Sequence, residues 1–318
     1  MNKPSMLCIG KAGQDTFLEG EVFKPLKDKG VFYEHIKLGE KFYVENATFS
    51  TGGNAPNAAV TFARQHLSTK FIGVLGDDPA GHSIINALDA EHIDTTAVVI
   101  DGDVRTSFST IMLAPTGERT ILDYPGTAKL KADHIDLENL DADWLYISSV
   151  GSMQLLKKIM KAAHEQGVSI AFNPASFELK HLQECADLLS HITLFAVNKE
   201  EAQLFVDGST VKTLAKKLSE SVKYVLVSDG AKGSVATDGH SIISAGMYED
   251  VPVKDRTGAG DAFTSGFVSQ IALGKSLEHA ITFASANSTS VVAQIGAKSG
   301  ILHSSSRIHS MDLRVESV

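Results

Sequence analysis

Segments with the pattern of strands and helices alternate regularly along the second half of the chain. Short apolar runs, which are typical of strands buried on both faces, are followed by amphipathic stretches long enough for helices. The apolar runs lie at 144–148, 168–172, 194–197 and 224–227, and the helical stretches at 153–166, 182–190, 200–205, 211–220, 261–273 and 277–293. Strands separated by helices pair in parallel, so the alternation predicts an α/β fold, with helices on both faces of a mostly parallel sheet.

Two early regions have a different pattern. Residues 6–10 and 70–76 are apolar and fit the parallel sheet, whereas residues 19–50 and 95–123 alternate aromatic, charged and apolar side chains, as half-exposed strands do. No linker or repeat separates these regions from the rest. We therefore expect one domain over 1–303 with a small inserted β lid formed by about 19–50 and 95–123. A Ser-rich tail follows at 304–318, and its structure is left open.

Charge and composition exclude several classes of protein. The net charge of −9 argues against nucleic-acid binding and membrane-surface binding, because both need clustered Lys and Arg. No apolar run is long enough to cross a bilayer, and the N-terminus lacks the pattern of a signal peptide. The two cysteines, Cys8 and Cys185, fall in apolar segments without metal-type spacing, as buried thiols of a reducing compartment do. We expect a soluble cytoplasmic protein that binds small molecules.

The stretch 253–263 contains the most informative motif. Gly258 and Gly260 allow several backbone N–H groups to face one point, and a helix starting there adds its positive dipole end. Asp261 follows directly, and a carboxylate is a poor phosphate ligand but a good acceptor for a hydroxyl proton. The combination indicates phosphoryl transfer to an alcohol. The alternative is an ordinary glycine turn with Asp261 as a helix cap.

Two further motifs suit a sugar. The pair Gly52-Gly53 allows close backbone approach, and Asn57 offers both a donor and an acceptor to a polyol. Asp15 follows the first strand at the end of the sheet where ligands gather. The alternatives are a glycine-rich helix start capped by Asn57 and a solvated loop carboxylate at Asp15.

Two motifs after later strands suit a metal–nucleotide complex. Asn198 and Glu201 would share one side of the first turn of a helix, facing phosphate-bound Mg²⁺ or its waters. Ser228 begins a glycine-containing loop that continues through Gly230 to Gly233 and would hold a nucleotide by its backbone. The alternatives are a capped helix start and a hairpin turn.

Taken together, and in this order, these motifs resemble those of the PfkB carbohydrate kinase family, also called the ribokinase family. The resemblance extends roughly from Met6 to Gly300 and is strongest at Gly52-Gly53 with Asn57 and at Asp255-x-Thr257-Gly-Ala-Gly-Asp261. It implies a ribokinase-like fold, which is a Rossmann-like three-layer α/β/α sandwich with a small β lid over the sugar. In such kinases the lid often contributes to a homodimer.

The resemblance also implies a role for each matching residue. Asp261 matches the catalytic base, and Gly258, Ala259 and Gly260 match the anion hole. The other matches are Asp15, Gly52, Gly53 and Asn57 for the sugar, Asn198, Ser228, Gly230, Gly233 and Ser285 for ATP, Glu201 for Mg²⁺ through water, and Asp255 and Thr257 for K⁺.

We therefore expect an ATP-dependent kinase that phosphorylates a hydroxymethyl group of fructose, ribose or a related keto-sugar. The residues between Gly53 and Asn57 match neither the ribokinase nor the fructokinase pattern, so the sugar stays open. A nucleoside kinase of the same fold is one alternative, because Tyr124 and aromatic lid residues such as Phe42 and Tyr43 would stack on a base. A sugar-binding sensor without catalysis is the other.

Overall fold

A parallel sheet with an antiparallel edge forms the centre of the protein. The computed structural model describes residues 3–116, 118–249 and 251–318. Within these ranges one sheet of nine strands has the order β17 (Leu313–Ser317), β16 (Ser241–Ala245), β15 (Ser234–Thr237), β14 (Tyr224–Ser228), β13 (Leu194–Asn198), β12 (Ser169–Phe172), β11 (Trp144–Ile147), β1 (Ser5–Ile9) and β6 (Ser68–Ile72). The strands from β14 to β6 pair in parallel, and β15 to β17 add to β14 in antiparallel fashion.

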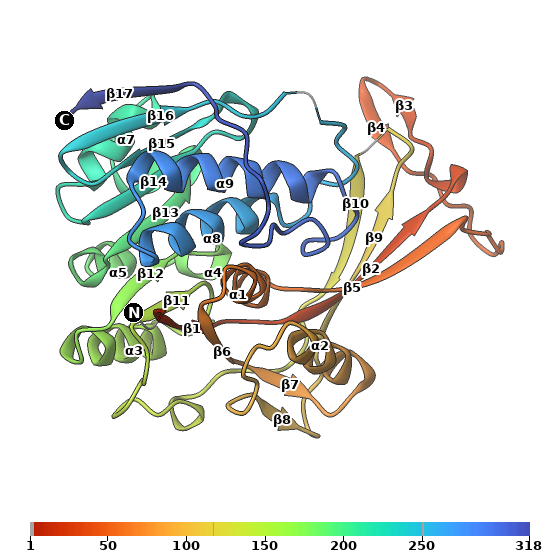
Figure 1. Cartoon of the computed structure of the whole chain (residues 1–318). Helices are drawn as coiled ribbons and strands as arrows, with labels where there is room; N and C mark the ends of the chain where they lie inside the picture. Colours follow the sequence, from red (N-terminus) through yellow and green to blue (C-terminus); the bar gives the residue numbers. More distant parts are fainter. Residues whose placement is uncertain (1–2, 117, 250) are drawn as a thin grey trace.

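Helices cover both faces of this sheet (Figure 1). The side chains of Met6 and Cys8 face one helical layer, and those of Leu7 and Ile9 face the other, because successive residues of a strand point to opposite faces. The first layer contains α1 (Asn54–Arg64), α2 (Pro79–Ala90), α8 (Ala259–Ala272) and α9 (Leu277–Val292), and the second contains α3 (Met153–Glu165), α4 (Ser176–Leu179), α5 (Leu182–Ala186), α6 (Lys199–Phe205) and α7 (Val211–Leu218). The expected three-layer α/β/α sandwich is confirmed.

A separate four-stranded sheet forms the lid, which projects from one end of the sandwich (Figure 1). Its order is β10 (Arg119–Tyr124), β9 (Ser107–Leu113), β2 (Gly13–Glu19) and β5 (Asn46–Gly52). One face is buried through Phe17, Ile111 and Leu113, and Ile295 packs on them. Two small pairs of strands accompany the lid, β3 (Leu26–Asp28) with β4 (Val31–Tyr33) and β7 (Val74–Gly76) with β8 (Val99–Asp101).

Three local features differ from the sequence-based expectation or complete it. Asp15 lies within strand β2 of the lid, not in a loop, because residues 13–19 pair with both β5 and β9. The expected strand at 70–76 is broken at Gly73, where a Cβ atom would lie 2.7 Å from the ring of Phe71. The tail ends in strand β17, which extends the central sheet through β16.

No helix in the described ranges has the length and apolar character that a bilayer crossing requires. The two cysteines are unpaired and buried, as expected for thiols within apolar segments.

Candidate active site

A left-handed glycine starts helix α8 at the end of the sheet where the lid is attached. Gly258 is the N-cap residue, with φ of 76° and ψ of 0°. A Cβ atom at this position would lie 2.4 Å from the Cβ of Ala297 and 2.6 Å from its Cα. Both the backbone conformation and the packing against the segment after α9 therefore require glycine here.

The first turn of α8 presents amide groups to open space. The first N–H groups of a helix have no acceptor within the helix. Ala259 N donates to Arg256 O at 3.3 Å, while no acceptor in the described part of the chain takes the amides of Gly260 and Asp261. A Cβ atom at Gly260 would meet nothing within 4 Å. These amides and the helix dipole form a site for an anion.

Asp261 is held beside this turn by a residue from another helix. Asn57 Nδ2 of α1 donates a hydrogen bond of 2.8 Å to Asp261 Oδ2. The pKa of Asp261 is raised to about 6, mainly by burial and in smaller part by the charge of Asp15, while Asn57 and Lys298 oppose the rise. A carboxylate with a pKa near neutrality is suited to act as a general base. Asn57 does not cap α1, because Gly53 occupies the N-cap position.

The glycine pair before α1 makes room for Asp15. A Cβ atom at Gly52 would lie 2.2 Å from Asp15 Oδ2, and one at Gly53 would lie 2.4 Å from the carbonyl oxygen of Lys11. Gly53 also has a φ of 102°, which disfavours other residues. Burial raises the pKa of Asp15 to about 6. Both glycines therefore have steric roles: Gly52 makes room for the Asp15 carboxylate, and Gly53 allows the backbone of Lys11 to approach.

Asp255 is a fully buried carboxylate in the turn before α8. Its Oδ1 accepts hydrogen bonds from Thr257 N at 2.9 Å and Thr257 Oγ1 at 2.8 Å, and its Oδ2 accepts one from Gly296 N at 3.1 Å. No cationic side chain of the described residues lies within 4.0 Å of it. A buried carboxylate in these surroundings suits a bound monovalent cation.

The residues expected for the nucleotide lie farther along the same edge of the sheet. Asn198 and Ser228 are paired neighbours at the carboxyl ends of β13 and β14. Asn198 and Glu201 cap α6 reciprocally, since Asn198 Oδ1 accepts from Glu201 N at 2.8 Å and Asn198 N donates to Glu201 Oε2 at 2.9 Å. Burial raises the pKa of Glu201. The capped helix start that was the alternative to a nucleotide site is therefore present. It leaves Glu201 Oε1 without a hydrogen-bond partner among the described residues, so this atom is available for another contact.

The loop after β14 contains two glycines with different surroundings. Gly230 has a φ of 52° and a Cβ atom there would meet nothing within 4 Å, whereas one at Gly233 would lie 2.3 Å from the carbonyl oxygen of Ala245. Gly233 is therefore required by packing within the protein. Only Gly230 of the two lies in open space, where a ligand has access.

Helix α9 carries two polar residues with different surroundings. Asn287 is fully buried and is used within the protein, because it donates to Ala262 O and accepts from Leu302 N, each at 2.8 Å. Ser285 is 4% exposed, and its Oγ has no hydrogen-bond partner among the described residues. Of the two residues, Ser285 retains a free polar group.

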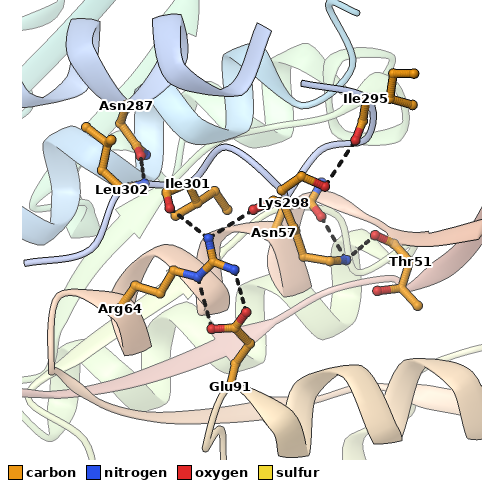
Figure 2. A network of polar contacts seen from close by, with 10 residues as sticks. Thr51, Asn57, Arg64, Glu91, Asn287, Ile295, Lys298, Ile301 and Leu302 are labelled. Atoms are coloured by element: carbon orange, nitrogen blue, oxygen red, sulfur yellow. Dashed lines mark hydrogen bonds and ion pairs between the residues drawn. The ribbon is translucent and has the colours of Figure 1, made fainter. Parts of the chain in front are cut away.

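Lys298 was missed at the sequence level. Its ammonium group donates to the carbonyl oxygen of Thr51 and to Asn57 Oδ1, the latter at 3.3 Å, so it lies beside the residues expected to bind the sugar (Figure 2). The sequence feature that could have indicated it is its place in the stretch 295–300, two residues after Gly296.

Comparisons with known proteins identify the family of this chain. Residues 30–303 match the model described as pfkB family carbohydrate kinase. The chain is 29% identical over 276 residues to a ribokinase of Haemophilus influenzae, covering 83% of this chain and 88% of that protein. It is 29% identical over 239 residues to a fructokinase of Vibrio alginolyticus, covering 68% and 75%. The solved structure of Arabidopsis thaliana ribokinase complexed with ribose and ATP has a TM-score of 0.75 and 24% identity, covering 95% of this chain and 96% of that chain.

Proposed function

This chain belongs to the PfkB family of carbohydrate kinases, and we propose that it transfers the γ-phosphate of ATP to a hydroxymethyl group of fructose, ribose or a related keto-sugar. The observation that carries the proposal is the position of Asp261. Its carboxylate lies at the start of α8, next to amides without acceptors, and is bonded to Asn57 in the region of Asp15.

In the proposed reaction Asp261 accepts the proton of the sugar hydroxyl as its oxygen attacks the γ-phosphorus. The amides at the start of α8 stabilise the negative charge that develops on the transferred group. Those of Gly260 and Asp261 have no acceptor among the described residues, and those of Gly258 and Ala259 directly precede them. Asp15 and Asn57 bind the other hydroxyl groups of the sugar and orient the reacting one, because each offers hydrogen-bonding atoms next to Asp261.

The nucleotide occupies the neighbouring edge of the sheet in this proposal. Ser228 and Gly230 contact its phosphates or ribose, Asn198 lies next to them, and Ser285 supplies its free hydroxyl on the adenine side. The solved ribokinase complex with ribose and ATP has the same fold, so a protein of this fold binds both kinds of substrate.

Mg²⁺ and K⁺ are the proposed ions. Mg²⁺ neutralises charge on the transferring phosphates, and the free Glu201 Oε1 would reach it through water. The described residues contain no group of three or more His, Cys, Asp or Glu side chains that would hold a metal, which fits an ion bound mainly by phosphates and water. Buried Asp255 with Thr257 would hold K⁺.

A homodimer through the lid is part of the proposal. Large apolar side chains are exposed on one face of the lid, where the strand register aligns Phe49, at 70% exposure, with Thr16, Thr110 and Leu122, the last at 57% exposure. Such a patch is typical of an interaction surface. Light scattering coupled to size-exclusion chromatography tests this, since Leu122→Glu would convert a dimer to a monomer, and a monomeric wild-type protein would contradict the proposal.

A panel of substrates tests the reaction. ADP release is measured with D-ribose, D-fructose, inosine and adenosine, for the wild-type protein and Asp261→Asn. We expect turnover with a sugar that Asp261→Asn abolishes. Turnover with nucleosides alone would assign a nucleoside kinase, and tight sugar binding without any turnover would assign a sensor.

A further inference from the structure

The segment after α9 brings a cationic group into the sugar half of the site. Lys298 is half-buried, and its Nζ donates to the carbonyl oxygen of Thr51 on β5 and to Asn57 Oδ1 on α1. The lysine therefore joins a lid strand to the helix that holds Asp261.

The charges around Lys298 come from several elements. Asp15 of β2 and Asp261 of α8 attract its ammonium group, Glu91 after α2 attracts it as well, and Arg64 of α1 repels it. Neither Asp15 nor Asp261 lies within the 4.0 Å of an ion pair. Burial lowers the pKa of Lys298 to about 8. A single cation thus interacts electrostatically with two carboxylates without forming an ion pair with either.

Lys298 also determines the orientation of the Asn57 amide. An ammonium group can only donate hydrogen bonds, so it must face Oδ1, and an ionised carboxylate can only accept them, so it must face Nδ2. The two contacts of Asn57, to Lys298 and to Asp261 Oδ2, agree with this requirement. Without the cation only the contact to Asp261 would hold the amide in this orientation, and the donor that fixes Asp261 Oδ2 would be less firmly positioned. With the donor in place, Oδ1 remains available for a substrate hydroxyl.

The backbone of Lys298 is anchored independently of its side chain. Arg64 Nη1 donates to the carbonyl oxygens of Lys298 at 3.1 Å and Ile301 at 2.7 Å (Figure 2). The same guanidinium group forms a two-pronged ion pair with Glu91, at 3.0 Å and 2.6 Å. A planar guanidinium bound on both sides fixes the loop to α1, which also carries Asn57. The position of Lys298 relative to Asn57 is therefore set by one rigid element.

We propose that Lys298 is a positioning residue for phosphoryl transfer, whose ammonium group fixes the Asn57 amide toward Asp261 and keeps Asp261 ionised beside Asp15. This proposal rests on the proposed function, in which Asp261 is the base. It adds that phosphoryl transfer depends on a cation at residue 298, which does not follow from the roles of the base and the anion hole alone.

The test is the pH dependence of kcat/KM for Lys298→Met and Lys298→Gln, measured by ADP release with the sugar that the wild-type protein phosphorylates. Met removes the charge and both hydrogen bonds, whereas Gln removes the charge and keeps a donor for Asn57. Because the cation lowers the pKa of Asp261, its removal moves the acid limb of the profile upward by roughly one pH unit in both variants, a loss of about fivefold at pH 6. At pH values above the limb, Gln retains more of the wild-type kcat than Met does.

Lys158→Met is the control, because Lys158 is an exposed residue of α3 that makes no ion pair among the described residues. Its profile should match that of the wild-type protein. An unchanged acid limb in a folded Lys298 variant overturns the proposal, and if the Met variant does not fold, the Gln variant decides. Asp261→Asn distinguishes a failure of the proposed function from a failure of the role proposed for Lys298. Normal turnover in that variant refutes Asp261 as base, whereas an inactive Asp261→Asn with unshifted Lys298 variants refutes only the role of Lys298.

Discussion

Two glycines at the start of α8, Gly258 and Gly260, should respond to the same substitution in opposite ways. At Gly258 an alanine meets a left-handed backbone, with φ of 76°, and a Cβ atom would overlap the Cβ and Cα of Ala297 at 2.4 Å and 2.6 Å. The backbone conformation costs about 1–2 kcal/mol for a residue other than glycine. The overlap with a backbone Cα costs a further ~1–3 kcal/mol, because the neighbouring segment must move.

At Gly260 neither cost applies. A Cβ atom there meets nothing within 4 Å, and Gly260 lies inside the helix rather than at its left-handed cap. Since alanine favours a helix over glycine, Gly260→Ala should leave the unfolding free energy unchanged or raise it by up to about 1 kcal/mol. The new methyl group would instead occupy the space in which we place the transferred phosphate. We expect kcat/KM to fall by at least ~100-fold, as on loss of an anion-hole donor.

Urea denaturation and ADP release distinguish the two effects. Gly258→Ala should lower the unfolding free energy by about 2–5 kcal/mol, the sum of the two costs above. Gly260→Ala should lose activity while its unfolding midpoint is maintained. An active Gly260→Ala protein would refute the assignment of the amides as an anion hole, and an unaltered midpoint for Gly258→Ala would refute the steric argument.

Four other measurements follow from the site. Because the base must be ionised, kcat/KM of the wild-type protein should fall as the pH drops below about 6, and a pH-independent rate between 5 and 8 would contradict this. Burial raises the pKa of Asp261 from 3.8 to about 6, so its ionised form opposes folding above pH 6. Asp261→Asn should therefore raise the unfolding free energy at pH 7.5 by at most about 3 kcal/mol. Urea denaturation should show no such increase in unfolding free energy below pH 3.8. In Gly52→Ala the new Cβ would displace Asp15 Oδ2, 2.2 Å away, so KM for the sugar should rise more than kcat falls, and an unchanged KM would argue against Asp15 as a sugar ligand. Asp255→Asn would place an N–H group opposite Gly296 N and should lower the unfolding free energy by about 1–3 kcal/mol. The same substitution should weaken activation in a K⁺ titration. Activation by K⁺ like that of the wild-type protein would exclude this cation site.

The sheet and the helical layers follow from local patterns. Apolar runs such as Leu145–Ile147 are buried on both faces, and the helices between them carry one apolar face, so periodicity alone identifies them. The lid was harder to place. Asp15 belongs to strand β2, which is paired on both sides by strands distant in sequence, and no local pattern shows such pairing.

The site shows the same contrast between local and tertiary information. Gly258 and Asp261 are recognisable because a glycine turn and a carboxylate at a helix start are adjacent in sequence. Lys298 is not, because its relation to Asn57 depends on a loop that Arg64 fastens to α1 across 234 positions of sequence. Gly52 and Gly53 were expected to contact the sugar, and the structure shows what their lack of side chains permits, which is the position of Asp15 and the approach of residue 11.

The most direct test of the account is a comparison of binding and turnover in Asp261→Asn. Calorimetry measures the affinity for ATP and for whichever of D-ribose and D-fructose the wild-type protein phosphorylates, and ADP release measures turnover of the same preparation. The account predicts affinities close to those of the wild-type protein and a fall in kcat of at least ~100-fold, because the substitution removes the base and retains the amide contact to Asn57. Near-normal kcat in the folded variant would contradict the central claim that Asp261 takes the proton of the sugar.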